Sequence, residues 1–146
     1  MNQQEVTVIE SERYGLLEIS ADNIFQFAKG IVGFEGFQSF ALVAAEDNAY
    51  YILHALQGQL SFLLVRADLF TEDYGFQINE ETVELLEISG SEQVVVFLIL
   101  NIIEDQPYVN LKAPILLAPN SRRGGQFVIH DQDYPLRFPL IRKEHA

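Results

Sequence analysis

The chain has 146 residues, of which 49% are hydrophobic, so we expect one domain over residues 1–146 with a single core. It has no cysteine, which excludes disulfides, and no apolar run longer than Val94–Leu100, which excludes a membrane-spanning helix. Its net charge of −12 makes direct binding to nucleic acid unfavourable. Because the N-terminus lacks the basic and apolar segments of a signal peptide, we expect a cytoplasmic protein without membrane contact.

The first half of the chain predicts short strands separated by turns. We expect strands over residues 6–9, 15–19, 40–44, 50–56 and 60–65. The last two flank Gln57–Gln59, whose central glycine is typical of a short hairpin loop. Residues 21–27 fit either a single helical turn or a strand, and both alternatives stay open.

The middle of the chain predicts one helix and one long strand. Asp68–Asp73 predicts a short helical turn capped by Asp68. Asn79–Leu86 predicts a helix with Asn79 as its N-cap residue, because the glutamates that follow suit the positive end of a helix. Gln93–Leu100 is apolar and rich in β-branched residues, which predicts a strand buried on both faces.

The C-terminal part predicts further strands that proline interrupts. We expect strands over residues 108–111, 115–117 and 127–130, and a polar loop over residues 120–125. Pro114 marks a break between the first two strands, and Pro135 and Pro139 predict irregular structure near the end. Many short strands with frequent turns indicate a mostly β fold, in which one antiparallel sheet closes as a small barrel or a tightly bent sandwich, with one or two short helical turns.

Three glycines at a spacing of three residues, Gly30, Gly33 and Gly36, lie in an apolar segment that also contains Phe34 and Phe37. Glycine permits a positive φ, so this segment predicts a tight turn with the two phenylalanines beside it. The spacing differs from the dinucleotide-binding fingerprint, so the glycines do not indicate a nucleotide cofactor.

This glycine loop and four later motifs resemble, in order, the motifs of the flagellar assembly factor FliW family. The later motifs are Leu56–Val65, Val109–Ile115, Arg122–Ile129 and Asp131–Tyr134. The resemblance extends from about residue 13 to about residue 140, which is nearly the whole chain. The family usually has proline where Val32 and Ala67 stand, and because proline fixes φ we expect both turns to be more mobile in this chain.

The resemblance implies a compact β-barrel-like fold and a regulator without enzymatic activity. It also implies two protein partners, namely flagellin and the RNA-binding translational repressor CsrA. In the family's scheme, flagellin in the cytoplasm holds FliW, which acts as its chaperone or stabiliser. Once flagellin is exported, free FliW binds CsrA and stops it repressing flagellin translation.

Eight residues are candidates for contacts with these partners. They are Phe34, Phe37, Glu80, Glu81, Glu84, Glu87, Asn110 and Leu111. The glutamates would attract a basic partner such as CsrA, although a solvated helix surface is the simpler explanation for them. The apolar residues would line a groove for a helix of flagellin, although Phe34 and Leu111 also suit a core. Asn110 stands between apolar neighbours, so its amide needs hydrogen-bond partners within the chain or in a ligand.

We expect no catalytic, cofactor or metal site. The three histidines, His54, His130 and His145, lie far apart, and no pair has the spacing of metal ligands. Two other classes of function stay open. One is a small β-barrel protein that holds a small-molecule ligand in its mouth, and the other is a hydrolase that uses a pair of carboxylates.

Overall fold

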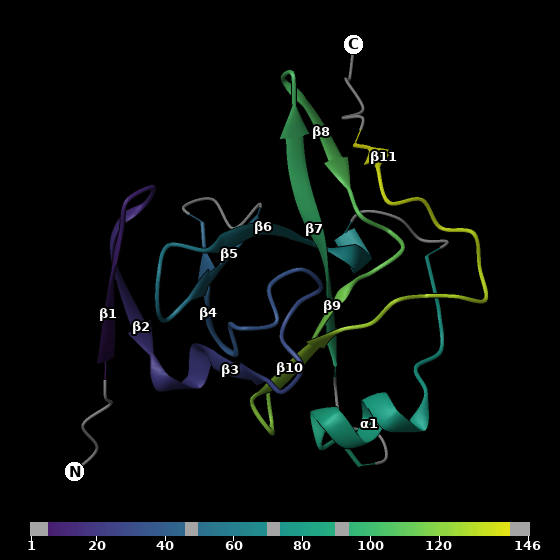
Figure 1. Cartoon of the computed structure of the whole chain (residues 1–146), viewed down its shortest axis with the longest axis horizontal. Helices are drawn as coiled ribbons and strands as arrows, with labels where there is room; N and C mark the ends of the chain where they lie inside the picture. The colour runs from purple at the N-terminus through teal and green to yellow at the C-terminus, as the bar shows by residue number, and fades with distance from the viewer. Residues whose placement is uncertain (1–5, 46–49, 70–73, 90–93, 141–146) are drawn as a thin grey trace.

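Seven strands close into a barrel in the computed structural model, which describes residues 6–45, 50–69, 74–89 and 94–140. In their order around the barrel they are β3 (Ile24–Phe27), β4 (Ser39–Ala44), β5 (Tyr51–Ala55), β6 (Ser61–Arg66), β7 (Val95–Ile103), β9 (Ile115–Ala118) and β10 (Arg123–Gln126). β7 pairs with β6 and with β9, and β10 closes the ring by pairing with β3 (Figure 1). The β3–β10 pair is parallel, and the other pairs of the ring are antiparallel. The prediction of a mostly β, barrel-like fold is confirmed.

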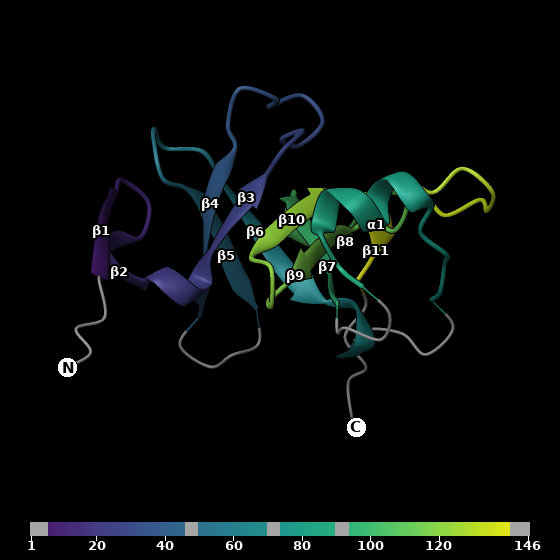
Figure 2. The same ribbon diagram turned by 90° about the horizontal axis from the view of Figure 1, so that it is seen from below.

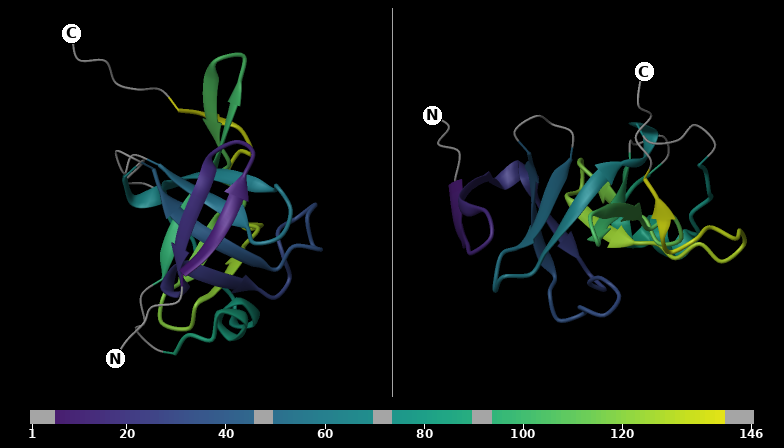
Figure 3. Two further views of the ribbon diagram at one scale, coloured as in Figure 1. Left: turned by 90° about the vertical axis from the view of Figure 1, so that its left-hand side faces the viewer. Right: turned by 90° about the horizontal axis from the view of Figure 1, so that it is seen from above.

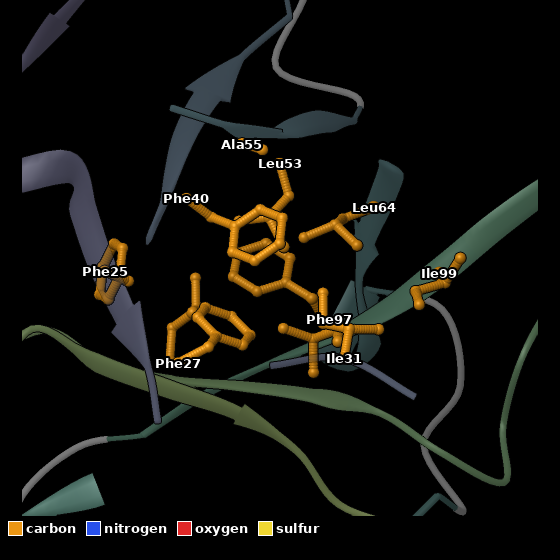
Figure 4. Packing of buried hydrophobic residues seen from close by; sticks show 11 residues of the cluster. Phe25, Phe27, Ile31, Phe40, Leu53, Ala55, Leu64, Phe97 and Ile99 are labelled. Atoms are coloured by element: carbon orange, nitrogen blue, oxygen red, sulfur yellow. The ribbon is translucent and has the colours of Figure 1, made fainter. Parts of the chain in front are cut away.

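Large apolar side chains fill the interior of the barrel. Figure 4 shows Phe27, Phe40, Leu53 and Leu64 converging there, and none of these four side chains is exposed to solvent. The rings of Phe27 and Phe40 meet edge to face with their centroids 5.1 Å apart, an arrangement that aromatic pairs prefer. Removing this apolar surface from water is the main force that stabilises the fold. A ligand inside the barrel would have to displace these side chains.

β7 is buried on both faces where it belongs to the barrel, as its sequence predicts. Phe97 and Ile99 pack in the interior cluster, whereas Leu98 packs in a second cluster on the outer side. The strand continues to Ile103, three residues beyond the predicted end, while Gln93 lies outside the described residues. β7 is therefore long enough to serve both the barrel and a hairpin outside it.

That hairpin forms where β7 leaves the barrel and pairs with β8 (Gln106–Val109), two residues earlier than the predicted strand (Figure 1). The short strand β11 (Phe138–Pro139) pairs with β8. The prediction that Pro139 lies in irregular structure is wrong. Proline is tolerated there because the N–H of Leu140, the next residue, donates to the Pro107 carbonyl at 2.9 Å, so the nitrogen of Pro139 points away from β8.

A second hairpin, formed by β1 (Val6–Ser11) and β2 (Gly15–Ser20), lies against the outside of the barrel (Figures 2 and 3). Ile9 and Ile19 pack with Ala41 of β4, and all three are buried. The 3-10 turn η1 (Ala21–Asn23) leads from this hairpin into β3. Residues 21–27 thus contain both alternatives that the sequence left open, first a helical turn and then a strand.

The helix α1 (Glu80–Leu86) begins as predicted, because the Asn79 side chain accepts a hydrogen bond from the Thr82 N–H at 2.9 Å. Of the other predicted turn, Asp68–Asp73, only the start is described: η2 covers Ala67–Leu69, and residues 70–73 lie outside the described part of the chain. The prediction that Asp68 caps this turn is wrong. Asp68 lies inside the turn, and its carboxylate accepts a hydrogen bond of 2.7 Å from the Arg66 guanidinium.

The last barrel strand covers residues 123–126, so the predicted polar loop over 120–125 is right for residues 120–122 and wrong for residues 123–125, and the predicted strand over 127–130 is wrong. Gly124 explains the difference. A Cβ atom on it would lie 2.5 Å from Cε1 of Phe27 and 2.8 Å from Cδ2 of Leu117. Only glycine lets β10 pass this close to both side chains, a requirement that a polar, glycine-containing segment does not reveal by itself.

Candidate functional site

An apolar groove lies on the outer side of the barrel, just before the start of α1. It has a volume of about 520 Å³. Its apolar lining consists of Ala67, Tyr74, Phe76, Ile78, Val94, Val96 and Leu116. Asp68 is the charged residue among those that line it. The groove continues the cluster in which Leu86 of α1 packs against β9, so the helix and the groove form one surface.

Two tyrosines fix the segment that lines this groove. The Tyr74 hydroxyl donates a 2.6 Å hydrogen bond to the Leu111 carbonyl, and its ring centroid lies 4.8 Å from that of Tyr134. The Tyr134 hydroxyl in turn donates to the Gly75 carbonyl at 2.9 Å. Tyr74 is half-buried, and burial raises its pKa, because the phenolate would lose its hydration there. Tyr74 therefore stays neutral and acts as a hydrogen-bond donor.

Three of the four candidate glutamates lie on α1, and the fourth, Glu87, is its C-cap residue. Glu81 forms an ion pair with Lys29, whose hydrogen bond and positive charge lower the pKa of Glu81. Glu87 forms an ion pair of 3.0 Å with Arg123 of β10. Within the described residues, Glu80 and Glu84 form no ion pair and are exposed. These two carboxylates are the ones free to meet a positively charged partner.

The glycine loop is a tight turn, as predicted, and it is tied to the rest of the barrel. Gly30 has φ +67°, and a Cβ atom on it would lie 2.8 Å from the Cα of Glu35. The Val32 N–H donates to the Gln126 side-chain oxygen at 2.9 Å, a bond that a proline at this position could not make. The N–H of Val32 thus links the loop to β10.

Phe34 and Phe37 lie close to the barrel interior. Phe34 is 40% exposed, and its ring meets the ring of Phe62 edge to face at 5.5 Å. Phe37 is partly buried and packs against the interior cluster. Phe34 is thus the more available of the two for contact with a partner.

Asn110 and Leu111 belong to a different part of the molecule. The Asn110 side-chain oxygen accepts hydrogen bonds of 3.0 Å from the backbone N–H groups of Lys112 and Ala113, which satisfies it within the chain. Leu111 is buried in the outer cluster, next to Tyr74. The two phenylalanines of the loop and the Asn110–Leu111 segment therefore do not line a common groove.

The groove residues Tyr74, Phe76 and Ile78 were missed as candidates. Their signal in the sequence is an alternation of apolar and other residues directly before the Asn79 cap, which is typical of an extended segment with one apolar face. The alternation gives the direction of these side chains but not the surface that they face. That surface, formed by β7 and β9, is known only from the closed barrel.

The titratable side chains of the described residues form no metal site. No group of three or more His, Asp or Glu side chains in this part of the chain could hold a metal ion. His54 is buried in β5, with Nδ1 2.8 Å from the Ala55 carbonyl oxygen and with Nε2 lacking a hydrogen-bond partner. No helix of the described residues is long and apolar enough to cross a membrane.

Comparisons with known proteins identify the family. The model of the FliW protein family matches residues 7–140. The flagellar assembly factor FliW of Caldicellulosiruptor saccharolyticus is 37% identical over 138 residues, which covers 92% of this chain and 91% of that protein. The proteins of the same name from Clostridium kluyveri and Bacillus licheniformis are both 34% identical, covering 93% and 91% of this chain and 97% and 96% of their own lengths. A crystal structure of the flagellar assembly factor FliW matches with a TM-score of 0.84 and 29% identity, over 92% of this chain and 97% of that one. The chain therefore belongs to the FliW family of flagellar assembly factors.

Proposed function

We propose that this protein acts in flagellar assembly by binding two proteins in the cytoplasm, flagellin and the translational repressor CsrA, without catalysing a reaction. Flagellin bound to it is stabilised before export. Once flagellin has been exported, the free protein binds CsrA and relieves the repression of flagellin translation. The observation that carries this proposal is the family match, which extends over residues 7–140 and so includes the whole barrel, the groove and α1.

The acidic surface of α1 supports binding to a basic protein such as CsrA. Glu80 and Glu84 are exposed and have no ion-pair partner among the described residues. The net charge of −12 adds a long-range attraction that steers a basic partner towards the protein. Glu81 and Glu87 already neutralise Lys29 and Arg123, so we assign them a smaller share of the attraction.

The groove next to α1 supports binding to a helical segment of flagellin. An amphipathic helix binds by placing apolar side chains from successive turns into an apolar groove. The lining of the groove is mainly apolar, and the Tyr74–Tyr134 contacts hold its wall in place before binding. A preformed groove loses less conformational entropy on binding, which favours affinity.

Charge reversal on α1 tests the proposed CsrA surface. We expect the double variant Glu80→Lys, Glu84→Lys to weaken binding to purified CsrA at least tenfold in titration calorimetry. Glu81 is left intact, because its replacement would also break the contact with Lys29. The matched control is Glu18→Lys on β2, an exposed glutamate outside α1, which should change the affinity less than twofold. If the double variant folds by circular dichroism and binds as tightly as the wild type, this surface is not the one that CsrA uses.

A second candidate occupant of the groove is a small apolar molecule, because the volume of about 520 Å³ lies in the range of small-molecule pockets. The site would then be the groove on the outer side and not the filled interior of the barrel. Thermal-shift measurements with a metabolite panel separate the two occupants. Stabilisation by a metabolite would support the small molecule, and stabilisation only by a helical peptide of flagellin, tested beside the panel, would support the protein partner.

A further inference from the structure

β6 and β7 separate at one end of the barrel and leave a fork between them. Their pairing ends at Leu63 and Leu100. Beyond that point β7 leaves the barrel to form the projecting hairpin with β8, while the first residues of β6 stay in the barrel (Figure 1). A cavity of about 450 Å³ lies at this fork, lined by residues from both strands and by Arg13 and Tyr14 of the β1–β2 turn.

The backbone of Ser61 points into the fork. The Ala55 N–H donates to the Leu60 carbonyl at 2.9 Å, so Leu60 directs its backbone groups towards β5. Successive residues of a strand direct their N–H and C=O groups to opposite sides. Ser61 and Leu63 therefore direct theirs towards β7. Leu63 is paired there with Leu100, whereas Ser61 has no partner on β7.

The same alternation applies to β7. The Asn110 N–H donates to the Ile99 carbonyl at 3.0 Å, so Ile99 directs its backbone groups towards β8. Leu100 and Ile102 therefore direct theirs towards the side of β6. The pairing with β6 ends at Leu100, so the N–H and C=O of Ile102 face the fork without a strand partner in the described part of the chain. Two strand edges thus face one cavity.

Open strand edges bind extended peptide backbone, because its N–H and C=O groups have the spacing that these edges require. The side chains at the fork place two further requirements on the peptide that binds there. Ile102 is 59% exposed and offers an apolar contact. Arg13 is the charged residue that lines the cavity, and within the described residues its guanidinium has no ion-pair partner. The occupant should therefore carry a carboxylate.

We propose that the fork between β6 and β7 is a docking site for an extended peptide segment of a partner protein, which adds a short strand there and places an acidic side chain against Arg13. This site lies at the opposite end of β7 from the groove, which contains Val94 and Val96. It also differs from α1 in the charge that it attracts, since α1 suits a basic partner. The proposal stands whether or not the protein binds CsrA through α1.

A peptide selection with the full chain as bait tests this site. The probe is a displayed library of random heptapeptides, and the best binder is then synthesised. We expect enriched sequences that alternate apolar residues and contain an aspartate or glutamate. In an amide-resolved NMR titration, the peptide should shift the backbone amides of Ser61 and Ile102. Failure to enrich any peptide above a resin without the protein would overturn the proposal, as would a titration in which neither amide moves.

Two matched comparisons then test the chemistry of binding. Arg13→Glu should weaken binding of the peptide about fivefold or more, the size expected for loss of an ion pair followed by repulsion. Arg137→Glu, which makes the same charge change at an exposed arginine outside the fork, should leave the affinity within twofold. The peptide with alternate backbone nitrogens methylated should lose binding, because it cannot pair as a strand. If the two arginine variants bind the peptide equally well, or if the methylated peptide binds as tightly as the unmethylated one, the fork does not bind in this way.

Discussion

Replacing Gly30 by alanine should destabilise the protein much more than the same replacement at Gly33, three residues away in the same loop. Both glycines have a positive φ, +67° and +88°, so both variants place a Cβ atom in a backbone conformation that alanine disfavours. The surroundings differ. A Cβ on Gly30 would lie 2.8 Å from the backbone Cα of Glu35, whereas a Cβ on Gly33 would meet nothing within 4 Å.

The magnitudes follow from these two environments. A left-handed alanine costs about 1–2 kcal/mol, partly offset by a less flexible unfolded chain, so Gly33→Ala should lower the free energy of unfolding by about 1 kcal/mol. Gly30→Ala adds crowding against backbone that cannot rotate away, which costs about 1–3 kcal/mol more. For a chain of this size, the melting temperature falls by about 2–4 °C for each kcal/mol.

Urea unfolding followed by circular dichroism measures both variants against the wild type. The slope of the free energy of unfolding against urea concentration should be the same in all three proteins, because they expose the same surface on unfolding. We expect the midpoint of Gly30→Ala to fall clearly below that of Gly33→Ala. If the two variants lose the same stability, the close approach of Gly30 to Glu35 does not constrain the loop.

Three further replacements test other parts of the structure by the same unfolding assay. Gly124→Ala should lower the free energy of unfolding by about 1–3 kcal/mol, because the new methyl group would collide with Phe27 in the interior. No change in stability would mean that β10 lies further from Phe27. Asn79→Ala should cost about 1 kcal/mol through loss of the helix cap, and Asn79→Ser should restore most of it. Asn110→Ala should lower the free energy of unfolding by about 1–3 kcal/mol, because it leaves two backbone N–H groups unpaired. Asn110→Asp keeps the accepting oxygen and should lower it less; equal losses would mean that this oxygen is not what stabilises the turn.

The elements that the sequence predicts well are those whose signals are local. Asn79 followed by two glutamates specifies the start of α1, because cap and helix-end charge act within one turn. The hairpin around Gly58 and the doubly buried β7 are likewise visible, one from its glycine and the other from its continuous apolar run. None of these features depends on how the barrel closes.

The errors arise where closure of the barrel decides the structure. Arg123–Gln126 is polar and contains two glycines, so its composition indicates a loop, yet it pairs with β3 and β9 because Gly124 fits between their side chains. Pro139 lies in a strand because the neighbouring Leu140 N–H makes the hydrogen bond to β8, at the Pro107 carbonyl, so the missing N–H of Pro139 is not needed for the pairing.

The candidate contact residues show the same division between local and tertiary signals. A run of glutamates predicts an acidic helix face, but only the folded structure shows that Glu81 and Glu87 pair with basic residues of distant segments. The side-chain oxygen of Asn110 accepts hydrogen bonds from the backbone N–H groups two and three residues further along the chain, which is a local turn that the sequence alone also permitted. The groove could not be predicted, since its lining comes from three segments far apart in sequence.

We propose that this member of the FliW family works by binding flagellin and CsrA. The most direct measurement is a pull-down with the full chain from a lysate of its own bacterium, taken while the cells make flagellin and analysed by quantitative mass spectrometry. We expect recovery of flagellin or CsrA in near-stoichiometric amounts, with CsrA lost selectively from the Glu80→Lys, Glu84→Lys variant. Recovery of neither protein from cells shown to contain both would contradict it.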